Sequence, residues 1–179
     1  MSTSQAPIGV SGSEKRARGS ARARALAERI EAGARELAAF AEGLSDAEWK
    51  IPMASGTDRR AVGVIVHHVA NMYPIEVDVA KTVAGGGAVD VTWDAVADIN
   101  AKHAAETSGV TKTAAIDLLR KNSRAAAEAV RGLTDEELDR AAPFGLSYGA
   151  PMTAQFVIED HALRHSWHHL ARIKKALKR

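Results

Sequence analysis

The segment TAQFVIEDHALRHSWHHLARIKKALK, residues 153–178, contains no proline or glycine and is rich in alanine, leucine, isoleucine and lysine. This composition predicts one long helix. Four of the seven histidines of the chain lie in this segment, at His161, His165, His168 and His169. Because residues four apart share one face of a helix, the side chains of His165 and His169 can reach the same metal ion.

The composition of the 179-residue chain favours helices over sheets. Alanine is abundant and aromatic residues make up only 4% of the sequence, which suits helices that pack closely through small side chains. Strand-like alternation is confined to residues 88–91. We therefore expect an all-α bundle, in which residues 15–179 form a single domain that follows a flexible lead-in at residues 1–14.

Several classes of protein are excluded by the composition. The chain has no cysteine, which excludes disulfides, zinc–thiolate sites and a cysteine nucleophile. No apolar run approaches the roughly 20 residues that span a membrane, and the polar N-terminus lacks the apolar core of a signal peptide. We therefore expect a cytoplasmic protein that does not enter the membrane.

Basic residues cluster at both ends of the chain but do not indicate nucleic-acid binding. Lysine and arginine total 24 against 22 acidic residues, so the net charge is small. The N-terminal cluster contains no aromatic side chain that could stack on a base; its members are Lys15, Arg16, Arg18, Arg22 and Arg24. The partner that we expect is a small-molecule substrate.

Glycine, proline and capping residues divide the chain into helical segments. The phrase GLSDAE at residues 43–48 contains a capping-box pattern, and GLTDEE at residues 132–137 echoes it. Asp58 can cap the second long helix, and Pro74 should kink or break that helix. The expected helices span residues 14–42, 59–84, 93–107, 112–131 and 153–178, and residues 141–152 should form a loop.

Helical projection, at about 100° per residue, separates the histidines of the last helix. His169 falls inside its apolar arc and His165 falls at the edge of that arc. His161 and His168 lie further round, toward the charged side. We therefore expect His165 and His169 to point inward, and His161 and His168 to lie at the surface or the rim of the bundle.

The helix predicted over residues 59–84 carries a second doublet, His67 and His68. His67 projects with polar residues, which predicts a surface position, whereas His68 projects with aliphatic residues. A neutral imidazole buried among aliphatic side chains needs a partner for its ring nitrogens. A metal ion shared with His165 and His169 would supply that partner; a hydrogen-bonded core histidine is the simpler alternative.

Glu76 and His103 are the remaining candidates. Glu76 lies two turns beyond His68, at the edge of the same apolar face. It is therefore a candidate catalytic residue, as a general base, a fourth metal ligand or a group that supports a ligand. His103 lies in the helix predicted over residues 93–107, where a core position and a pocket position are both open.

Three histidine ligands would make an open metal site. Without cysteine ligands, they would leave coordination positions for water or substrate, as in catalytic rather than structural sites. Imidazole suits zinc, nickel and iron(II). We therefore expect a divalent transition metal but leave its identity open.

Two stretches carry a resemblance to a known family. VGVIV at residues 62–66 precedes His68, and HSWHHLARI at residues 165–173 contains the inward pair. Their order and separation resemble the DinB/YfiT superfamily of metalloenzymes, which includes bacillithiol and mycothiol S-transferases and mycothiol-dependent maleylpyruvate isomerase. WDAVADINAKH at residues 93–103 and GLTDEEL at residues 132–138 are similar to its actinobacterial branch. The resemblance extends over residues 26–178.

The resemblance implies a four-helix bundle with long crossover connections, usually as a homodimer. It also implies a metal site at one end of the bundle, with ligands at His68, His165 and His169, which are the residues that the projection selects. One departure is that Leu170 follows His169, where the family motif continues with arginine and glycine.

The leading functional hypothesis is a metal-dependent transferase that uses a low-molecular-weight thiol. The metal would hold the thiol as a thiolate at neutral pH, and mycothiol is favoured because the chain resembles actinobacterial proteins. Arg60 and Arg172 are candidates for binding an anionic cosubstrate. Two alternatives stay open: a hydrolase or isomerase that uses metal-activated water, and a metal-binding or stress-related protein without turnover.

Overall fold

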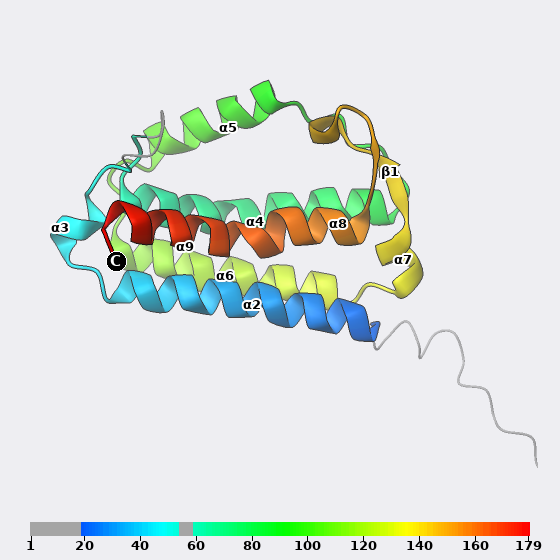
Figure 1. The fold of residues 1–179 in the computed structure, drawn as a ribbon, viewed down its shortest axis with the longest axis horizontal. Coiled ribbons are helices and arrows are strands. Elements are labelled where there is room, and N and C mark those ends of the chain that lie inside the picture. The colour runs from blue at the N-terminus through cyan, green and yellow to red at the C-terminus, as the bar shows by residue number, and fades with distance from the viewer. Residues whose placement is uncertain (1–18, 54–58) are drawn as a thin grey trace, which may run out of the picture.

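The computed structural model describes residues 19–53 and 59–179. Four long helical stretches pack side by side (Figure 1): α2 (Ala21–Glu42), α4 (Val62–Ala84), α6 (Lys112–Arg131), and a final helix made of α8 (Ala154–Ile158), the π-helical turn η2 (Glu159–Leu163) and α9 (Arg164–Ala176). α2 packs on α6, α6 packs on α4, and the final helix contacts both α2 and α4. The all-α four-helix bundle is therefore confirmed.

Some expectations concern residues outside the described ranges. The lead-in at residues 1–14, the cap at Asp58 and the basic residues Lys15, Arg16 and Arg18 lie there. In the described part, α2 begins at Ala21, where the Ser20 side chain caps it by accepting a hydrogen bond from the Ala23 amide. Across the same residues, no helix is both long and apolar enough to cross a membrane.

The start of α4 differs from the prediction. The helix begins at Val62 rather than at residue 59, because the preceding chain is held in an extended pairing. The Met53 amide donates to the Arg60 carbonyl at 2.8 Å, and the Val62 amide donates to the Ile51 carbonyl at 2.9 Å. Backbone groups that are paired in this way are not available to extend the helix.

α4 runs through Pro74 without the break that the proline predicted. Proline has no amide hydrogen, so the carbonyl of Ala70, four residues earlier, loses its donor in the helix. The side-chain amide of Asn122 on α6 donates to that carbonyl at 2.9 Å, and Pro74 itself is exposed. The neighbouring helix thus satisfies the carbonyl that the proline leaves open.

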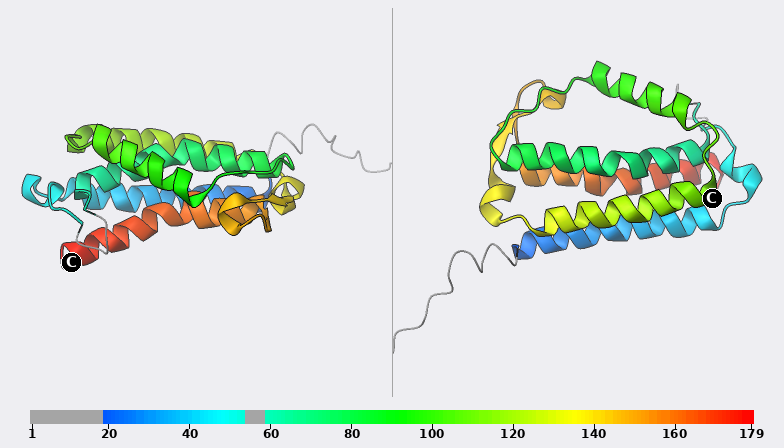
Figure 2. Two further views of the ribbon diagram at one scale, coloured as in Figure 1. Left: turned by 90° about the horizontal axis from the view of Figure 1, so that it is seen from above. Right: turned by 180° about the vertical axis from the view of Figure 1, so that it is seen from behind.

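A long connection joins α4 to α6. These two helices run in the same direction, so the chain between them must return along the bundle (Figure 1). α5 (Trp93–Glu106) makes this return and stands apart from the packed helices (Figure 2). Thr92 caps α5 by accepting a hydrogen bond from the Ala95 amide, and His103 is the one buried residue of this helix.

The shorter connections contain both confirmed and corrected elements. Capping boxes at Ser45 and Thr134 open the short helices α3 (Asp46–Trp49) and α7 (Asp135–Asp139). The loop expected at residues 141–152 is wrong, because β1 (Ala141–Pro143) and β2 (Pro151–Thr153) form an antiparallel pair around the 3-10 turn η1 (Gly145–Ser147). Strands of this length show no alternation that a sequence could reveal. The possible strand at residues 88–91 amounts to one bridge, between Val89 and Phe144.

Two contacts fix the final helix at the level of its histidines. The hydroxyl groups of Tyr73 on α4 and Ser166 on α9 are hydrogen-bonded at 2.7 Å, and both residues are fully buried. On the opposite side, Gly33 of α2 lies against α9, where an added Cβ would be 2.8 Å from Nε1 of Trp167. A side chain at residue 33 would have to displace the Trp167 indole. Packing thus sets the position of α9 relative to α4.

Candidate metal centre

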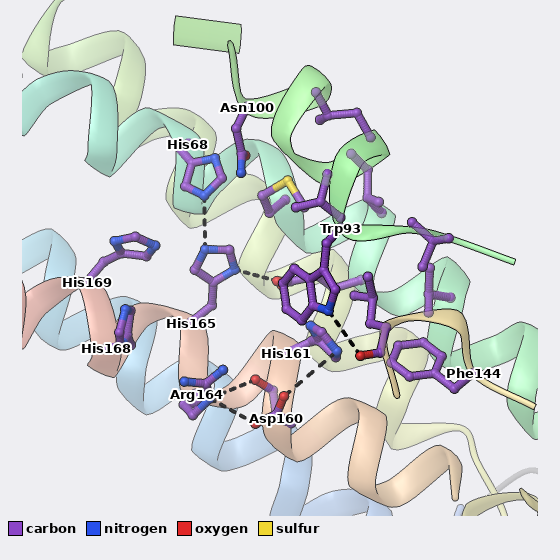
Figure 3. A pocket seen from close by; sticks show the side chains of 18 of the residues that line it. His68, Trp93, Asn100, Phe144, Asp160, His161, Arg164, His165, His168 and His169 are labelled. Atoms are coloured by element: carbon purple, nitrogen blue, oxygen red, sulfur yellow. Dashed lines mark hydrogen bonds and ion pairs between the residues drawn. The ribbon is translucent and has the colours of Figure 1, made fainter. Parts of the chain in front are cut away.

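The three histidines selected from the sequence converge between α4 and α9 (Figure 3). One ring nitrogen from each of His68, His165 and His169 lies within 4.8 Å of the others. The Nε2 atoms of His68 and His165 are 3.2 Å apart. Two nitrogens on one zinc ion lie roughly 3.3 Å apart, so this spacing fits a shared ion. We refer to the three residues as the histidine triad.

Helix geometry brings the histidine triad together. His165 and His169 lie one turn apart on α9, within a regular α-helical stretch. His165 contacts both Glu76 and His68 of α4, and His169 contacts His68 with ring centroids 5.3 Å apart. Residues further along α9 therefore face residues earlier in α4, because the two helices are antiparallel.

Burial keeps His169 in the neutral form. His68 and His169 are only 4% and 5% exposed. Burial lowers the pKa of His169 far below its usual value, and the neighbouring His165 and His68 lower it further. Among the described residues, Nδ1 of His169 finds no hydrogen-bond partner. A neutral buried imidazole with an unsatisfied nitrogen fits a metal ligand, because buried polar atoms are normally paired.

Glu76 supports the triad from α4. Its Oε1 atom accepts a hydrogen bond from Nδ1 of His165, which leaves the Nε2 lone pair of that ring facing His68. A carboxylate behind a histidine fixes the tautomer and the orientation of the ring and strengthens it as a ligand. Of the three roles considered for Glu76, this contact favours support of a ligand. Within the described chain its second oxygen, Oε2, has no partner, so it can also accept a proton.

The other four histidines lie around the triad. His168 is exposed, as expected, but His161 is half-buried and packs against Phe144 with ring centroids 5.6 Å apart. His67 is also half-buried, and its Nδ1 atom lies 2.8 Å from Nε2 of the buried His103. The surface position predicted for His67 is therefore wrong, and His161 lies at the pocket rather than fully in solvent. The π-helical turn shifts His161 out of phase with α9, and α5 covers His67 by placing His103 against it.

The triad opens into a pocket with a volume of 440 Å³. Near one end, the indole Nε1 of Trp93 donates to the Leu146 carbonyl at 3.2 Å. A pocket of this size with mainly apolar walls and a few polar groups is typical of small-molecule sites. The apolar lining comes from α4, from α5 and from the segments near β1, and it consists of Met72, Ile75, Val79, Val91, Trp93, Val96, Ile99, Phe144 and Leu146.

Charged groups also line this pocket. Nε of Arg164 lies 3.0 Å from Oδ1 of Asp160, and His161 lies 3.9 Å from the same carboxylate (Figure 3). Arg60 and Arg172, which the sequence proposed as binding groups for an anionic cosubstrate, both line the pocket as well.

Trp93, Asn100 and Phe144 are pocket residues that were not site candidates from the sequence. Asn100 of α5 lies beside His68 in Figure 3. The sequence could have indicated Asn100 as a pocket residue, because it lies three residues before the candidate His103 on the same face of the helix. Phe144 gave no such signal, since it lies between strands that the sequence did not predict.

Comparisons with known proteins agree with this architecture. A family model of the DinB superfamily matches residues 29–173. A solved structure with a similar fold is YfiT from Bacillus subtilis, described as "a probable metal-dependent hydrolase with an unusual four-helix bundle topology". The two chains share 19% identity at a TM-score of 0.64, over 97% of this chain and 92% of that chain, so the likeness shows a common fold. No protein with a curated description matches the sequence.

Proposed function

The chain belongs to the DinB superfamily, and on this basis we propose that it is a metal-dependent enzyme that acts on a small molecule at the histidine triad. The observation that carries the proposal is the convergence of three histidines, supported by Glu76, at a 440 Å³ pocket. The likeness to YfiT, which is described as "a probable metal-dependent hydrolase", gives further support.

His68, His165 and His169 are the proposed ligands. A divalent transition metal, whether zinc, nickel or iron, would supply Lewis acidity that keeps a nucleophile deprotonated at neutral pH. Glu76 holds the proton on Nδ1 of His165, so that Nε2 is free to bind the metal. The mainly apolar walls lower the polarity of the space beside the triad, which strengthens electrostatic interactions there.

The first candidate nucleophile is a low-molecular-weight thiol such as mycothiol. The resemblance to the actinobacterial branch supports this choice, and the chain has no cysteine of its own, so any thiol must arrive as a cosubstrate. In such a transfer the thiol loses its proton to solvent and its sulfur bonds to an electrophilic carbon of the substrate. The leaving group departs from that carbon with the bonding electron pair.

The second candidate nucleophile is water, which would make the protein a hydrolase or an isomerase. The description of YfiT as "a probable metal-dependent hydrolase" favours this candidate. Glu76 Oε2 is a suitable acceptor for a proton from water. A metal-binding protein without turnover is the remaining alternative, and the homodimer and the cytoplasmic location stay predictions.

A thiol-dependence assay separates these functions. Purified protein is incubated with 1-chloro-2,4-dinitrobenzene and with mycothiol, glutathione, cysteine or no thiol, and ester hydrolysis is measured in parallel. The thiol-transferase proposal expects a rate that requires one of the thiols and is lost in His165→Ala but retained in His168→Ala. Ester hydrolysis that is independent of added thiol would instead support the hydrolase. Absence of both activities from metal-loaded protein, with these and related substrates, would favour the alternative without turnover.

A further inference from the structure

His161 lies at the pocket but is not one of the proposed metal ligands. It precedes His165 by four residues in the final helix, which corresponds to about 6 Å along the helix axis. Both residues line the pocket, and in Figure 3 both side chains extend from the final helix on the side where Trp93 lies. A ligand of a few carbon atoms that is bound at the histidine triad can therefore reach His161.

A π-helical turn places His161 at the pocket. This turn, η2, spans Glu159–Leu163, and its wider hydrogen bonding shifts the side chains away from α-helical periodicity. With regular periodicity, His161 would project toward the charged side of the helix. Single π-helical turns within α-helices often coincide with functional sites. The turn is thus an observation, independent of the pocket, that points to His161.

Packing holds the imidazole of His161 in place. The ring lies against Phe144 with centroids 5.6 Å apart, and the side chain is only 20% exposed. Burial lowers the pKa of His161, so the ring is neutral at pH 7 and carries one donor nitrogen and one acceptor nitrogen. A ring that is already fixed in this way loses little conformational freedom when a ligand binds to it.

The ring nitrogens of His161 are available to a ligand. Nε2 lies 3.9 Å from Oδ2 of Asp160, which is beyond hydrogen-bond distance, and Asp160 pairs instead with Nε of Arg164 at 3.0 Å. Within the described chain, the His161 ring makes no hydrogen bond. Because half-buried polar groups in a mainly apolar wall are normally paired, a molecule bound in the pocket is the expected partner.

We propose that His161 is a substrate-binding residue, which hydrogen-bonds a polar group of the ligand whose reacting group lies at the histidine triad. The ligand is then a small molecule with a metal-binding group and a second polar group, such as a hydroxyl or a carbonyl, about 6 Å apart. Its apolar part would lie against Trp93 and Phe144, which also line the pocket. The inference rests on the proposed function only in placing the reacting group at the triad.

Pairs of hydroxamates test the proposal. A hydroxamate chelates a divalent metal through both of its oxygens. Straight-chain probes from acetohydroxamate to hexanohydroxamate, each with and without a terminal hydroxyl, vary the distance to a second polar group. The full chain is loaded with cobalt(II), which suits imidazole ligands, and is titrated with each probe while visible absorption is recorded. At one chain length the hydroxyl should tighten binding by about fivefold, relative to the same pair on free cobalt(II).

Variants of His161 assign this preference to its ring. His161→Phe keeps an aromatic ring against Phe144 but has no ring nitrogen, so the preference for the hydroxyl should fall to within about twofold, with unchanged affinity for the unsubstituted probe. His161→Gln retains a donor and an acceptor and should keep part of the preference. Asp98→Asn changes an exposed residue of α5 that does not line the pocket and should affect neither probe.

Three outcomes would overturn the assignment of His161. The first is wild-type protein that shows no preference for the hydroxyl at any chain length, a result that does not depend on the folding of a variant. The second is a preference that is unchanged in His161→Phe. The third is loss of the preference in Asp160→Asn together with its retention in His161→Phe, which would assign the contact to Asp160.

The same titrations separate this inference from the proposed function. If cobalt(II) does not bind, or binds no hydroxamate, the open metal centre is wrong and the inference falls with it. If the preference is seen and depends on His161, the residue binds the ligand even when the thiol-dependence assay finds no turnover.

Discussion

The carboxylate of Glu76 on α4 accepts a hydrogen bond from Nδ1 of His165 on α9, so one helix orients a proposed metal ligand that belongs to the other. His165 in turn faces His68, eight residues before Glu76 on the same helix. The two contacts hold the imidazole from both of its nitrogens. Metal affinity should therefore depend on Glu76, although the proposed ligands are the three histidines.

Substitution of Glu76 should weaken metal binding in a graded way. Glu76→Gln retains an oxygen acceptor but loses the charge, so its affinity for the metal should fall by about tenfold. Glu76→Ala loses both the acceptor and the charge, so its affinity for the metal should fall further, toward about 100-fold. Competition with a chromophoric chelator measures both values. Asp160→Asn is a suitable control, because Asp160 lines the pocket without contacting the triad. Wild-type affinity in both Glu76 variants would refute the supporting role.

The buried hydrogen bond between Tyr73 and Ser166 should contribute to stability. Tyr73→Phe leaves the Ser166 hydroxyl buried without its partner, at a cost of about 1–3 kcal/mol in the free energy of unfolding. Urea denaturation measures this loss. In the double variant with Ser166→Ala, the loss should be smaller than the sum of the two single losses. Strict additivity would show that the two hydroxyls do not interact.

Stability at alkaline pH should also depend on Tyr73. Burial raises the pKa of its hydroxyl above the ordinary 10.0, so the folded state disfavours the tyrosinate. The resulting stabilisation is complete below the unfolded pKa and is lost as pH rises toward the folded one, with a slope of at most about 1.4 kcal/mol per pH unit. Urea titrations between pH 9 and 11 should show a steeper loss for the wild type than for Tyr73→Phe. Parallel curves would contradict the burial effect.

α5 should open more readily than the four packed helices. Since His103 is its one buried residue, its amides should exchange with deuterium faster than those of α4, where most residues are buried. Hydrogen-exchange mass spectrometry compares the two helices directly. His103→Ala should increase exchange in α5 and leave α6 unchanged. Equal protection of α5 and α4 would mean that the crossover helix is part of the packed core.

The orientation of a histidine could be predicted from the sequence where the apolar residues that define the buried face lie in one regular helix. His165 and His169 both lie in α9, so a projection with α-helical periodicity kept their relative phase. His68 lies well inside α4, where the apolar face is broad. α6 was predicted at residues 112–131 with Gly132 as its end, and the structure gives the same bounds.

Prediction was less successful where an irregular helical turn or a tertiary contact altered a local rule. His161 lies in the π-helical turn η2, whose i→i+5 bonding breaks the assumed periodicity. Pro74 does not interrupt α4 because Asn122 of another helix satisfies the open carbonyl. His67 is covered because α5 crosses α4 there. For Pro74 and His67 the cause lies in a partner that is distant in sequence, which periodicity cannot reveal.

The most direct test of the central claim is the metal content of purified protein and of four histidine variants. Elemental analysis should find about one divalent transition metal per chain in the wild type and in His168→Ala, which removes an exposed neighbour of His169. His68→Ala, His165→Ala and His169→Ala should each lose most of it after equal exposure to metal. Unchanged metal content in these three variants, or equal loss in His168→Ala, would contradict the assignment of the histidine triad as the metal site.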